Sequence, residues 1–521
     1  MSTRQKLPLN KAVLKKLVDE NCCYVDKTPY IKQLLDDGAG YWFLSRPRRF
    51  GKSLFLDTLR AAFAGEKELF KGLFLEKNWD WSIKYPVVTI SFGGGTAKSS
   101  EELNTIFFEL LNVQAEEYDI VLSQITISGR FSELLRKLYK KFKLGVVVLV
   151  DEYDKPLLDN LTKDIVDEIR EELSGFYSVL KDSDKYLKFV FLTGVSKFSK
   201  TSIFSKLNNL IDISLEPKYA DICGYTQKDL ETVFADYLHD VDLDKVRQWY
   251  NGYNFLGSNV YNPYDVLLFL LNKRYQCYWF RTGTPTFLLD LIKDKKYFLP
   301  DLNNIEINEF QMEEFDIHSI KLDVLLFQAG YLTIKRVYTV GEDRYYSLSF
   351  PNKEVKKGLN AYLVRMFFGD GTEATHISKL SQIIYLSLDA NNPAPLEKAF
   401  FSFFASIPHQ WYVKNNIAHY EGYYCCAFYS FFAALDLTIK PEDMTNKGRI
   451  DFTVIMEKGV FIFEIKMKSN PKNAIVQIKE RKYHEKYLSE NKEIFLIGIE
   501  FDEEERNLSK FEVEKIMDYL K

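Results

Sequence analysis

The chain has 521 residues and a mass of 61.0 kDa, enough for about three domains of ordinary size. Because 46% of the residues are apolar, the chain can bury a sizeable core. Its formal net charge of −4 at pH 7 excludes binding of nucleic acid through overall positive charge, so any such function must rest on local patches.

The sequence carries no targeting or membrane-spanning signal. The N-terminal stretch MSTRQKLPLN lacks the apolar segment of a signal peptide, and no apolar run reaches the length of about 18 residues that a membrane span needs. The cysteines show no CxxC spacing for a metal or redox pair. We therefore expect a cytoplasmic protein with reduced thiols and no membrane partner.

The first part of the chain alternates strands and helices. Several strand candidates are continuous apolar runs, which are typical of parallel strands covered on both faces. The pattern predicts a doubly wound parallel sheet in a P-loop-type α/β domain over residues 5–215. The expected strands are 41–45, 86–92, 145–151, 188–194 and 210–215.

Three further regions follow. Residues 216–300 are rich in helix and suit a lid over the sheet. Within a connector over 301–394, a helix, a hairpin and a second helix suggest a winged-helix-like module, although such units are common. The last domain, 395–521, is expected to place its elements in α-β-β-α-β order, with an aromatic helix at 421–435 and a basic helix at 472–489.

The stretch FLSRPRRFGKSLFLDTL runs from an apolar strand through a basic turn into an amphipathic helix. Gly51, Lys52 and Ser53 match the last three positions of the phosphate loop GxxxxGK[ST], whereas Arg46 stands in place of its first glycine. Lys52 suits the terminal phosphates of a nucleotide, and the Ser53 hydroxyl suits Mg²⁺.

The middle of this turn departs from the standard loop. Arg48 and Arg49 add positive charge, and we expect them to assist Gly51 in holding phosphates. Pro47 has no N–H to donate, so the wrap around the phosphates differs from the standard one. The same residues also suit a basic corner between a strand and a helix that binds nothing.

The run GVVVLVDEYDKPL places two carboxylates at the end of an apolar strand. Adjacent charges there are costly unless a cation or a polarised water uses them. We expect Asp151 to hold Mg²⁺ through water and Glu152 to orient and deprotonate the attacking water. Alternatively, the pair only caps the helix that follows.

The next strand ends in FLTGVSKFSK. Thr193, Ser196 and Lys197 stand where a polar group would contact the γ-phosphate, and Thr193 is the nucleotide-binding candidate among them, although Thr-Gly is also ordinary turn chemistry. Three glycines at 93–95 follow a strand without a lysine or a partner carboxylate, so we interpret them as a flexible loop.

The strings YVDKTPYI, FLSRPRRFGKS, VLVDEYDKPL, LTGVSKFS and DICGYT resemble those of the bacterial AAA-ATPase-like family, whose members often carry a nuclease-like C-terminal domain. The resemblance covers about residues 5–290. The family tends to have RPRRFGKS in place of the glycine-led loop, so Arg46 follows the family pattern. The resemblance implies ATP as the ligand.

The C-terminal segment GRIDFTVIMEKGVFIFEIKMK reads as a hairpin. If Lys458 and Gly459 form a two-residue turn, Asp451 faces Lys466 and lies diagonally across from Glu464. The three side chains then share one face. Two carboxylates and a lysine suit phosphodiester hydrolysis assisted by Mg²⁺ or Mn²⁺, in which Asp451 and Glu464 hold the metal.

Flanking helices offer more candidates. Glu421 begins the aromatic helix and offers a further carboxylate, while Gln477 lies on the basic helix. The arrangement resembles the PD-(D/E)XK nuclease superfamily over about residues 395–500. The same residues also suit a cross-strand ion-pair ladder beside a solvated basic helix. The basic residues expected to contact a substrate backbone are Lys479, Arg481, Lys482 and Lys486.

We therefore expect an ATP-binding and ATP-hydrolysing protein whose nucleotide state controls a Mg²⁺-dependent nuclease domain. A role of this protein in defence or in the control of mobile elements is a hypothesis from the architecture alone. ATP and nucleic acid, DNA in preference to RNA, are the expected partners, and a homo-oligomer is left open. One alternative is a nucleotide-dependent switch or adaptor that binds nucleic acid or protein without cleavage. In another, the nuclease acts alone and the first domain binds nucleotide weakly.

Overall fold

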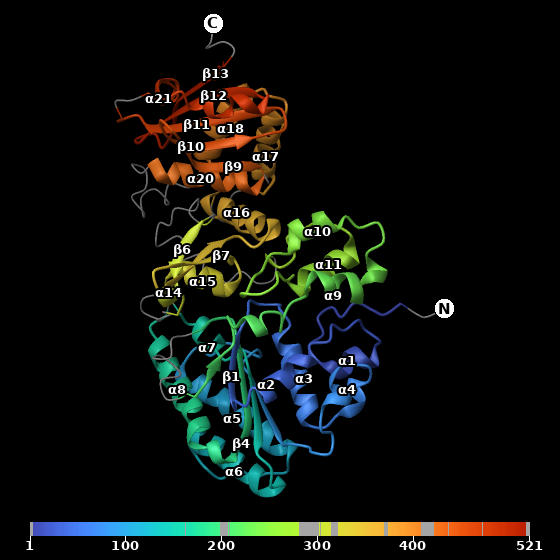
Figure 1. Ribbon diagram of the computed structural model, residues 1–521. Coiled ribbons are helices and arrows are strands. Elements are labelled where there is room, and N and C mark those ends of the chain that lie inside the picture. The colour runs from blue at the N-terminus through green and yellow to red at the C-terminus, as the bar shows by residue number, and fades with distance from the viewer. Residues whose placement is uncertain are drawn as a thin grey trace. The chain divides into compact units, whose positions relative to one another are not determined.

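The computed structural model divides the chain into two compact units (Figure 1). The N-terminal unit comprises Met1–Lys295 and Asn304–Asn352, and the C-terminal unit comprises Lys296–Asn303 and Lys353–Lys521. Each unit has its own five-stranded sheet, and the N-terminal unit also holds a sheet of three strands. The structure describes residues 4–161, 163–197, 207, 209–280, 302, 304–313, 321–368, 374–407, 421–435, 437–470 and 473–516.

The main sheet of the N-terminal unit is parallel, as predicted, with strand order β2-β3-β4-β1-β5. Its central strands are buried on both faces, which explains their continuous valine- and leucine-rich sequences. The strands are β1 (Tyr41–Ser45), β2 (Val87–Ser91), β3 (Val146–Asp151), β4 (Leu187–Gly194) and β5 (Ile211–Asp212).

Helices cover both faces of this sheet; Figure 1 shows α3 and α8 on opposite sides of it. On the α8 side, Phe176 stacks on Phe107 of α5 and on Phe131 of α6, with ring centroids 4.2 and 4.6 Å apart. The helices are α1 (Leu14–Asp19), α2 (Thr28–Asp36), α3 (Lys52–Phe63), α4 (Leu75–Asn78), α5 (Ser100–Glu117), α6 (Ile127–Phe142), α7 (Lys155–Leu158) and α8 (Val166–Asp182).

The strand order brings distant segments together. Strand β4 lies between β1 and β3, with Leu44 of β1 beside Thr193 and Val150 of β3 beside Leu192. Because parallel strands end at the same edge of a sheet, the loops that follow β1, β3 and β4 lie next to one another. This edge carries the candidate nucleotide site.

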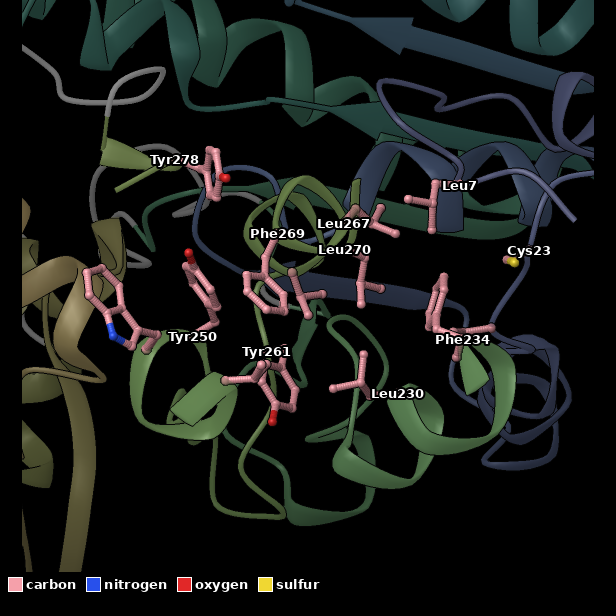
Figure 2. Packing of buried hydrophobic residues seen from close by; sticks show 14 residues of the cluster. Leu7, Cys23, Leu230, Phe234, Tyr250, Tyr261, Leu267, Phe269, Leu270 and Tyr278 are labelled. Carbon is pink, nitrogen blue, oxygen red and sulfur yellow. The ribbon is translucent and has the colours of Figure 1, made fainter. Parts of the chain in front are cut away.

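A helical region follows, with α9 (Gln227–Val233), α10 (Leu243–Tyr250) and α11 (Pro263–Asn272). Figure 2 shows its apolar core, which also includes Leu7 and Cys23 from the N-terminal segment. The start of the chain is therefore part of this helical core. The other buried members are Val25, Leu230, Phe234, Val246, Trp249, Tyr250, Tyr261, Val266, Leu267, Phe269, Leu270 and Tyr278.

The expected helix-hairpin-helix order is present. The helix α15 (Leu322–Ala329) precedes the hairpin of β7 (Thr333–Val340) and β8 (Asp343–Ser349), and α16 (Lys353–Phe368) follows. An additional strand, β6 (Ile305–Asn308), pairs with β8, and α14 (Glu309–Glu313) follows it. The division between the units falls after β8, so the hairpin belongs to the N-terminal unit and α16 belongs to the C-terminal unit.

The C-terminal unit holds a mixed sheet of order β13-β12-β11-β10-β9, in which β11 and β12 are parallel. The aromatic helix α20 packs on it through Phe428 and Phe432, whose rings contact Phe452 of β10. The elements are α17 (Ala374–Asp389), α18 (Ala394–Ala405), α20 (Glu421–Ala434), β9 (Thr438–Thr445), β10 (Gly448–Ile455), β11 (Gly459–Met467), α21 (Ala474–Glu480), β12 (Glu493–Asp502) and β13 (Asn507–Lys515).

Three expectations for this sheet were wrong. The expected α-β-β-α-β order lacks the two edge strands, β9 and β13. Ile455 pairs with Val460, and the Met456 N–H donates to the Gly459 carbonyl at 2.8 Å. The two residues at the tip of the hairpin are therefore Glu457 and Lys458, one position earlier than expected. Every cross-strand partner therefore lies two residues from its predicted place. The expected basic helix is α21 followed by a 3-10 helix, interrupted at Lys482 with φ of 49°.

Among the helices that the structure describes, none is both long and apolar enough to cross a membrane.

Candidate functional site

The turn between β1 and α3 closes over the side chain of Lys52. Gly51 precedes the helix with φ of 93°, a conformation that glycine adopts without strain. The buried Lys52 ammonium donates to the carbonyl oxygens of Arg46, at 2.8 Å, and Pro47, at 2.9 Å. Burial lowers the pKa of Lys52. The result is a compact basic turn at the N-terminus of a helix, which is where anions bind.

Asp151 joins this turn to the neighbouring strands. Its Oδ2 accepts a hydrogen bond of 2.5 Å from the Ser53 hydroxyl, and its Oδ1 accepts one of 2.7 Å from the Thr193 hydroxyl. The carboxylate is 8% exposed, so both bonds lie in a shielded environment. A carboxylate and a hydroxyl in contact form a set of oxygen donors that suits Mg²⁺.

Glu152 follows Asp151 in a left-handed conformation, with φ of 55°. Burial is the main cause that raises its pKa, and the charge of Asp151 adds to it. A Cβ placed on Gly93 would lie 3.4 Å from Oε2 of Glu152. The glycine loop 93–95, which the sequence suggested was merely flexible, therefore borders this carboxylate. A carboxylate with a raised pKa suits a general base.

The loop after β4 is organised by Asp154. Its Oδ2 accepts hydrogen bonds from the Val195 N–H at 2.9 Å and from the Ser196 N–H and hydroxyl at 2.6 Å each. Lys197 pairs with Asp212 on β5 at 2.7 Å. Ser196 and Lys197 thus bind other partners, whereas Thr193 meets Asp151. Asp154 was missed because its partners are remote in the sequence.

Arg46 points away from the Lys52 ammonium. The side chain is 1% exposed, and its guanidinium lies 3.9 Å from the centre of the Phe255 ring. Burial lowers its pKa to about 10. Arg46 therefore fastens the start of the turn to the chain that follows β5. Its guanidinium donates to the carbonyl oxygens of Ser45 (2.9 Å), Ser214 (2.7 Å), Tyr219 (3.2 Å) and Ala220 (3.3 Å).

Arg48 and Arg49 border a cavity of about 500 Å³ that extends from this turn. The carbonyl oxygen of Arg48 accepts from the indole N–H of Trp279 at 3.2 Å, and the exposed Arg49 guanidinium lies 4.9 Å from the Tyr264 ring centre. The cavity brings together Gly51, Lys52, Ser53 and Glu152 with Leu9 and Ala12 of the N-terminal segment and Leu267 of α11.

The second cluster lies on the C-terminal sheet. Glu464 of β11 is 1% exposed, and its Oε1 accepts from the Lys466 ammonium at 3.0 Å and from the Gln477 amide. The Lys466 ammonium also donates to the Ile465 carbonyl at 3.0 Å. Gln477 comes from α21, so this helix reaches the carboxylate on the strand.

Asp451 stands beside this cluster. Its Oδ2 accepts a hydrogen bond of 2.6 Å from the Ile465 N–H. The Tyr483 hydroxyl donates to the Arg449 carbonyl at 2.9 Å, and the pKa of Tyr483 is raised by burial first and then by the charges of Glu464 and Asp451. Tyr483 is thus a neighbour of both carboxylates that the sequence reasoning did not single out.

The remaining candidates separate. Glu421 begins α20 as expected, and its side chain lies outside what the structure describes. Lys479 pairs with Glu514 at 2.9 Å, and Lys486 pairs with Asp443. Within the described ranges, no three His, Cys, Asp or Glu side chains are grouped to hold one ion.

The sequence matches known families in both regions. A model described as "Predicted AAA-ATPase" matches residues 12–204, and one of the PD-(D/E)XK nuclease superfamily matches residues 419–511. An "Uncharacterized protein in vnfD 5'region" of Azotobacter chroococcum mcd 1 is 45% identical over 518 residues, covering 99% of this chain and all of that protein. The chain belongs to the AAA-ATPase-like family.

The two matches contain the two clusters of this AAA-ATPase-like protein. The first includes the basic turn, Asp151 and Thr193, and the second includes Asp451, Glu464 and Gln477. The protein therefore combines an AAA-ATPase-like domain on a parallel sheet with a C-terminal domain of the PD-(D/E)XK superfamily on a mixed sheet.

Proposed function

We propose that the protein binds and hydrolyses ATP and that its nucleotide state controls Mg²⁺-dependent cleavage of nucleic acid by the C-terminal domain. The observation that carries the ATPase part is the double hydrogen bonding of Asp151 by Ser53 and Thr193 beside Lys52. It joins the start of α3 and the ends of β3 and β4 at one carboxylate, next to a cavity of about 500 Å³.

In this proposal, each residue of the first site has one role. Gly51 and the helix N-terminus hold phosphate, and Lys52, Arg48 and Arg49 supply positive charge. Ser53 and Asp151 hold Mg²⁺, which when bound neutralises phosphate charge. Glu152 takes the proton of the attacking water, because its raised pKa lets it accept a proton more readily than an ordinary glutamate. Thr193 orients Asp151.

The second site is proposed to cut phosphodiester bonds. Asp451 and Glu464 offer oxygen ligands for Mg²⁺ or Mn²⁺, with Glu421 as a further carboxylate, and the metal when bound activates water and stabilises charge on the phosphate. Gln477 and Lys466 orient Glu464 through the hydrogen bonds described above. Lys466 also supplies positive charge for the phosphate. DNA is the expected substrate in preference to RNA.

Control by nucleotide is the part of the proposal that rests on architecture. A single chain carries both domains, and a nuclease active only in one nucleotide state would cut only after that state is reached. Defence against foreign DNA or control of mobile elements is the role that such conditional cutting suits. The domain boundaries at 215, 300 and 394 belong to the same proposal.

The experiment is cleavage of labelled single- and double-stranded DNA and RNA in Mg²⁺ or Mn²⁺, with and without ATP. The full chain is compared with Lys52→Ala and Glu464→Ala, and ATP hydrolysis is measured in parallel. We expect Lys52→Ala to lose hydrolysis and ATP-dependent cutting, and Glu464→Ala to lose cutting while it keeps hydrolysis.

Other outcomes separate the alternatives. Cutting that ignores ATP and survives Lys52→Ala would mean that the nuclease acts alone. Hydrolysis without cutting of any substrate, and with nucleic-acid or protein binding that survives Glu464→Ala, would identify a nucleotide-dependent switch or adaptor.

A further inference from the structure

The corner between α15 and β7 contacts the basic turn between β1 and α3. Gly330 ends α15 with φ of 94°, and a Cβ placed on it would lie 2.7 Å from Cβ and 2.9 Å from Cγ of Pro47. The ring of Pro47 therefore rests on the Gly330 backbone. The ring centroids of Trp279 and Tyr331 lie 5.1 Å apart, and the indole N–H of Trp279 donates a hydrogen bond to the Arg48 carbonyl.

The same corner also holds the loop after β4. The side-chain oxygen of Gln328, on the last turn of α15, accepts a hydrogen bond of 3.0 Å from the Lys197 N–H. Gln328 is 7% exposed, so this bond is shielded from water. Lys197 lies four residues beyond Thr193, in the loop that leaves the site.

These two loops carry groups of the candidate nucleotide site. Pro47 touches Gly330 on one side, and on the other its carbonyl accepts the hydrogen bond from Lys52. A displacement of Pro47 therefore moves the acceptor of the Lys52 ammonium. The loop after β4 likewise continues directly from Thr193, which bonds Asp151.

We propose that Gly330 and Gln328 are positioning residues of the nucleotide site, acting through Pro47 and Lys197. The inference rests on the proposed ATPase function and adds residues from outside the matched ATPase region, 12–204. Because α15 leads into the β7–β8 hairpin, the corner also joins the two loops to the three-stranded sheet.

The main test compares Gly330→Ala with Gly341→Ala in the full chain. Both glycines have positive φ, but a Cβ on Gly341 (φ of 63°) would have no atom within 4 Å. Both changes place an alanine at positive φ, and the contact with Pro47 is found at Gly330 and not at Gly341. We expect Gly330→Ala to raise the Kd for ATP about tenfold or more, and Gly341→Ala to leave it within about twofold.

Gln328 provides a second test that does not depend on the folding of Gly330→Ala. Gln328→Ala removes the acceptor of the Lys197 N–H, whereas Gln328→Glu keeps an oxygen at that place. We expect Gln328→Ala to lower kcat for ATP hydrolysis about three- to tenfold with little change in KM, and Gln328→Glu to restore most of it.

The outcomes distinguish this inference from the function on which it rests. If the unmodified chain hydrolyses ATP, and Gly330→Ala and Gln328→Ala match Gly341→Ala in Kd, kcat and KM, the corner does not position the site and the ATPase proposal stands. If the unmodified chain binds no ATP, the ATPase proposal and this inference fail together.

Discussion

Ser53, at the start of α3, donates a 2.5 Å hydrogen bond to Asp151, at the end of β3, although the two residues are 98 positions apart. Since the proposed magnesium ligands are this pair, Asp151→Asn should lower the rate of ATP hydrolysis about a hundredfold or more and raise the Mg²⁺ concentration needed. Steady-state hydrolysis across a Mg²⁺ titration measures both effects.

Asp184→Asn is the matched control, because Asp184 accepts a hydrogen bond of 2.8 Å from the Tyr41 hydroxyl at the start of β1. It removes the same charge without touching Ser53. Equal Mg²⁺ requirements in the two variants would remove Asp151 from the metal site.

The pH dependence of hydrolysis should report Glu152. Its pKa is raised above the ordinary value of 4.5, chiefly by burial, so the proton-accepting form is lost at a higher pH than for an exposed glutamate. We expect hydrolysis to fall as the pH decreases through this raised pKa, giving an acidic limb above pH 4.5. A profile of kcat against pH reveals the limb, and Glu152→Gln should abolish it together with most of the activity. An unchanged limb in the residual activity of that variant would assign it to another group.

Arg46→Gly restores the glycine of the standard phosphate loop, yet it should destabilise the protein. The change removes a buried guanidinium and the hydrogen bonds that it donates to the carbonyl oxygens of Ser214 and Ala220, at a cost of about 3–5 kcal/mol. Urea unfolding followed by tryptophan fluorescence measures it. The tryptophans of the N-terminal unit that report the transition are Trp42, Trp79, Trp81, Trp249 and Trp279.

Arg49→Gly is the control for that change. Arg49 is exposed and has φ of 69°, so glycine there should be neutral or slightly stabilising. Similar unfolding midpoints for the two variants would show that Arg46 does not fasten the turn.

Gln477 should matter for cutting through Glu464. Gln477→Ala removes the amide that donates to this carboxylate, and we expect cleavage to fall about tenfold with a weaker response to Mg²⁺. Lys479→Ala on the same helix serves for comparison, because Lys479 pairs with Glu514 and should change cleavage less than about twofold. The rate of cleavage of labelled DNA is measured for both variants. A larger loss of cleavage in Lys479→Ala than in Gln477→Ala would favour contact of the basic helix with the substrate.

The sequence predicted the parallel sheet, because apolar runs mark buried parallel strands. It also assigned Ser53, Asp151 and Thr193 to one site, and the structure brings the three side chains into contact. The edge strands β9 and β13 were missed. Pro441 lies within β9, and charged residues alternate along β13; both features are typical of edge strands, which must avoid pairing with other chains.

The hairpin shows where prediction from spacing fails. The turn lies one residue earlier than assumed, which moved each cross-strand partner by two residues, and a shift of two keeps every side chain on its expected face. The expectation that Asp451 shares a face with Glu464 and Lys466 is therefore unaffected by the error. Gly93 and Asp154 were missed for a different reason, since their roles depend on contacts between separate loops.

The division of the chain after Asn352 bears on the order of synthesis. The residues of the main sheet, of the helical core and of the α15–β7 corner all precede Lys353, whereas Asp451 and Glu464 follow it. Domains fold as units while the ribosome is still translating. The unit that contains the AAA-ATPase-like match can thus be complete before Asp451 or Glu464 has been made. Under the proposed function, a newly made nuclease domain would emerge already attached to its regulator.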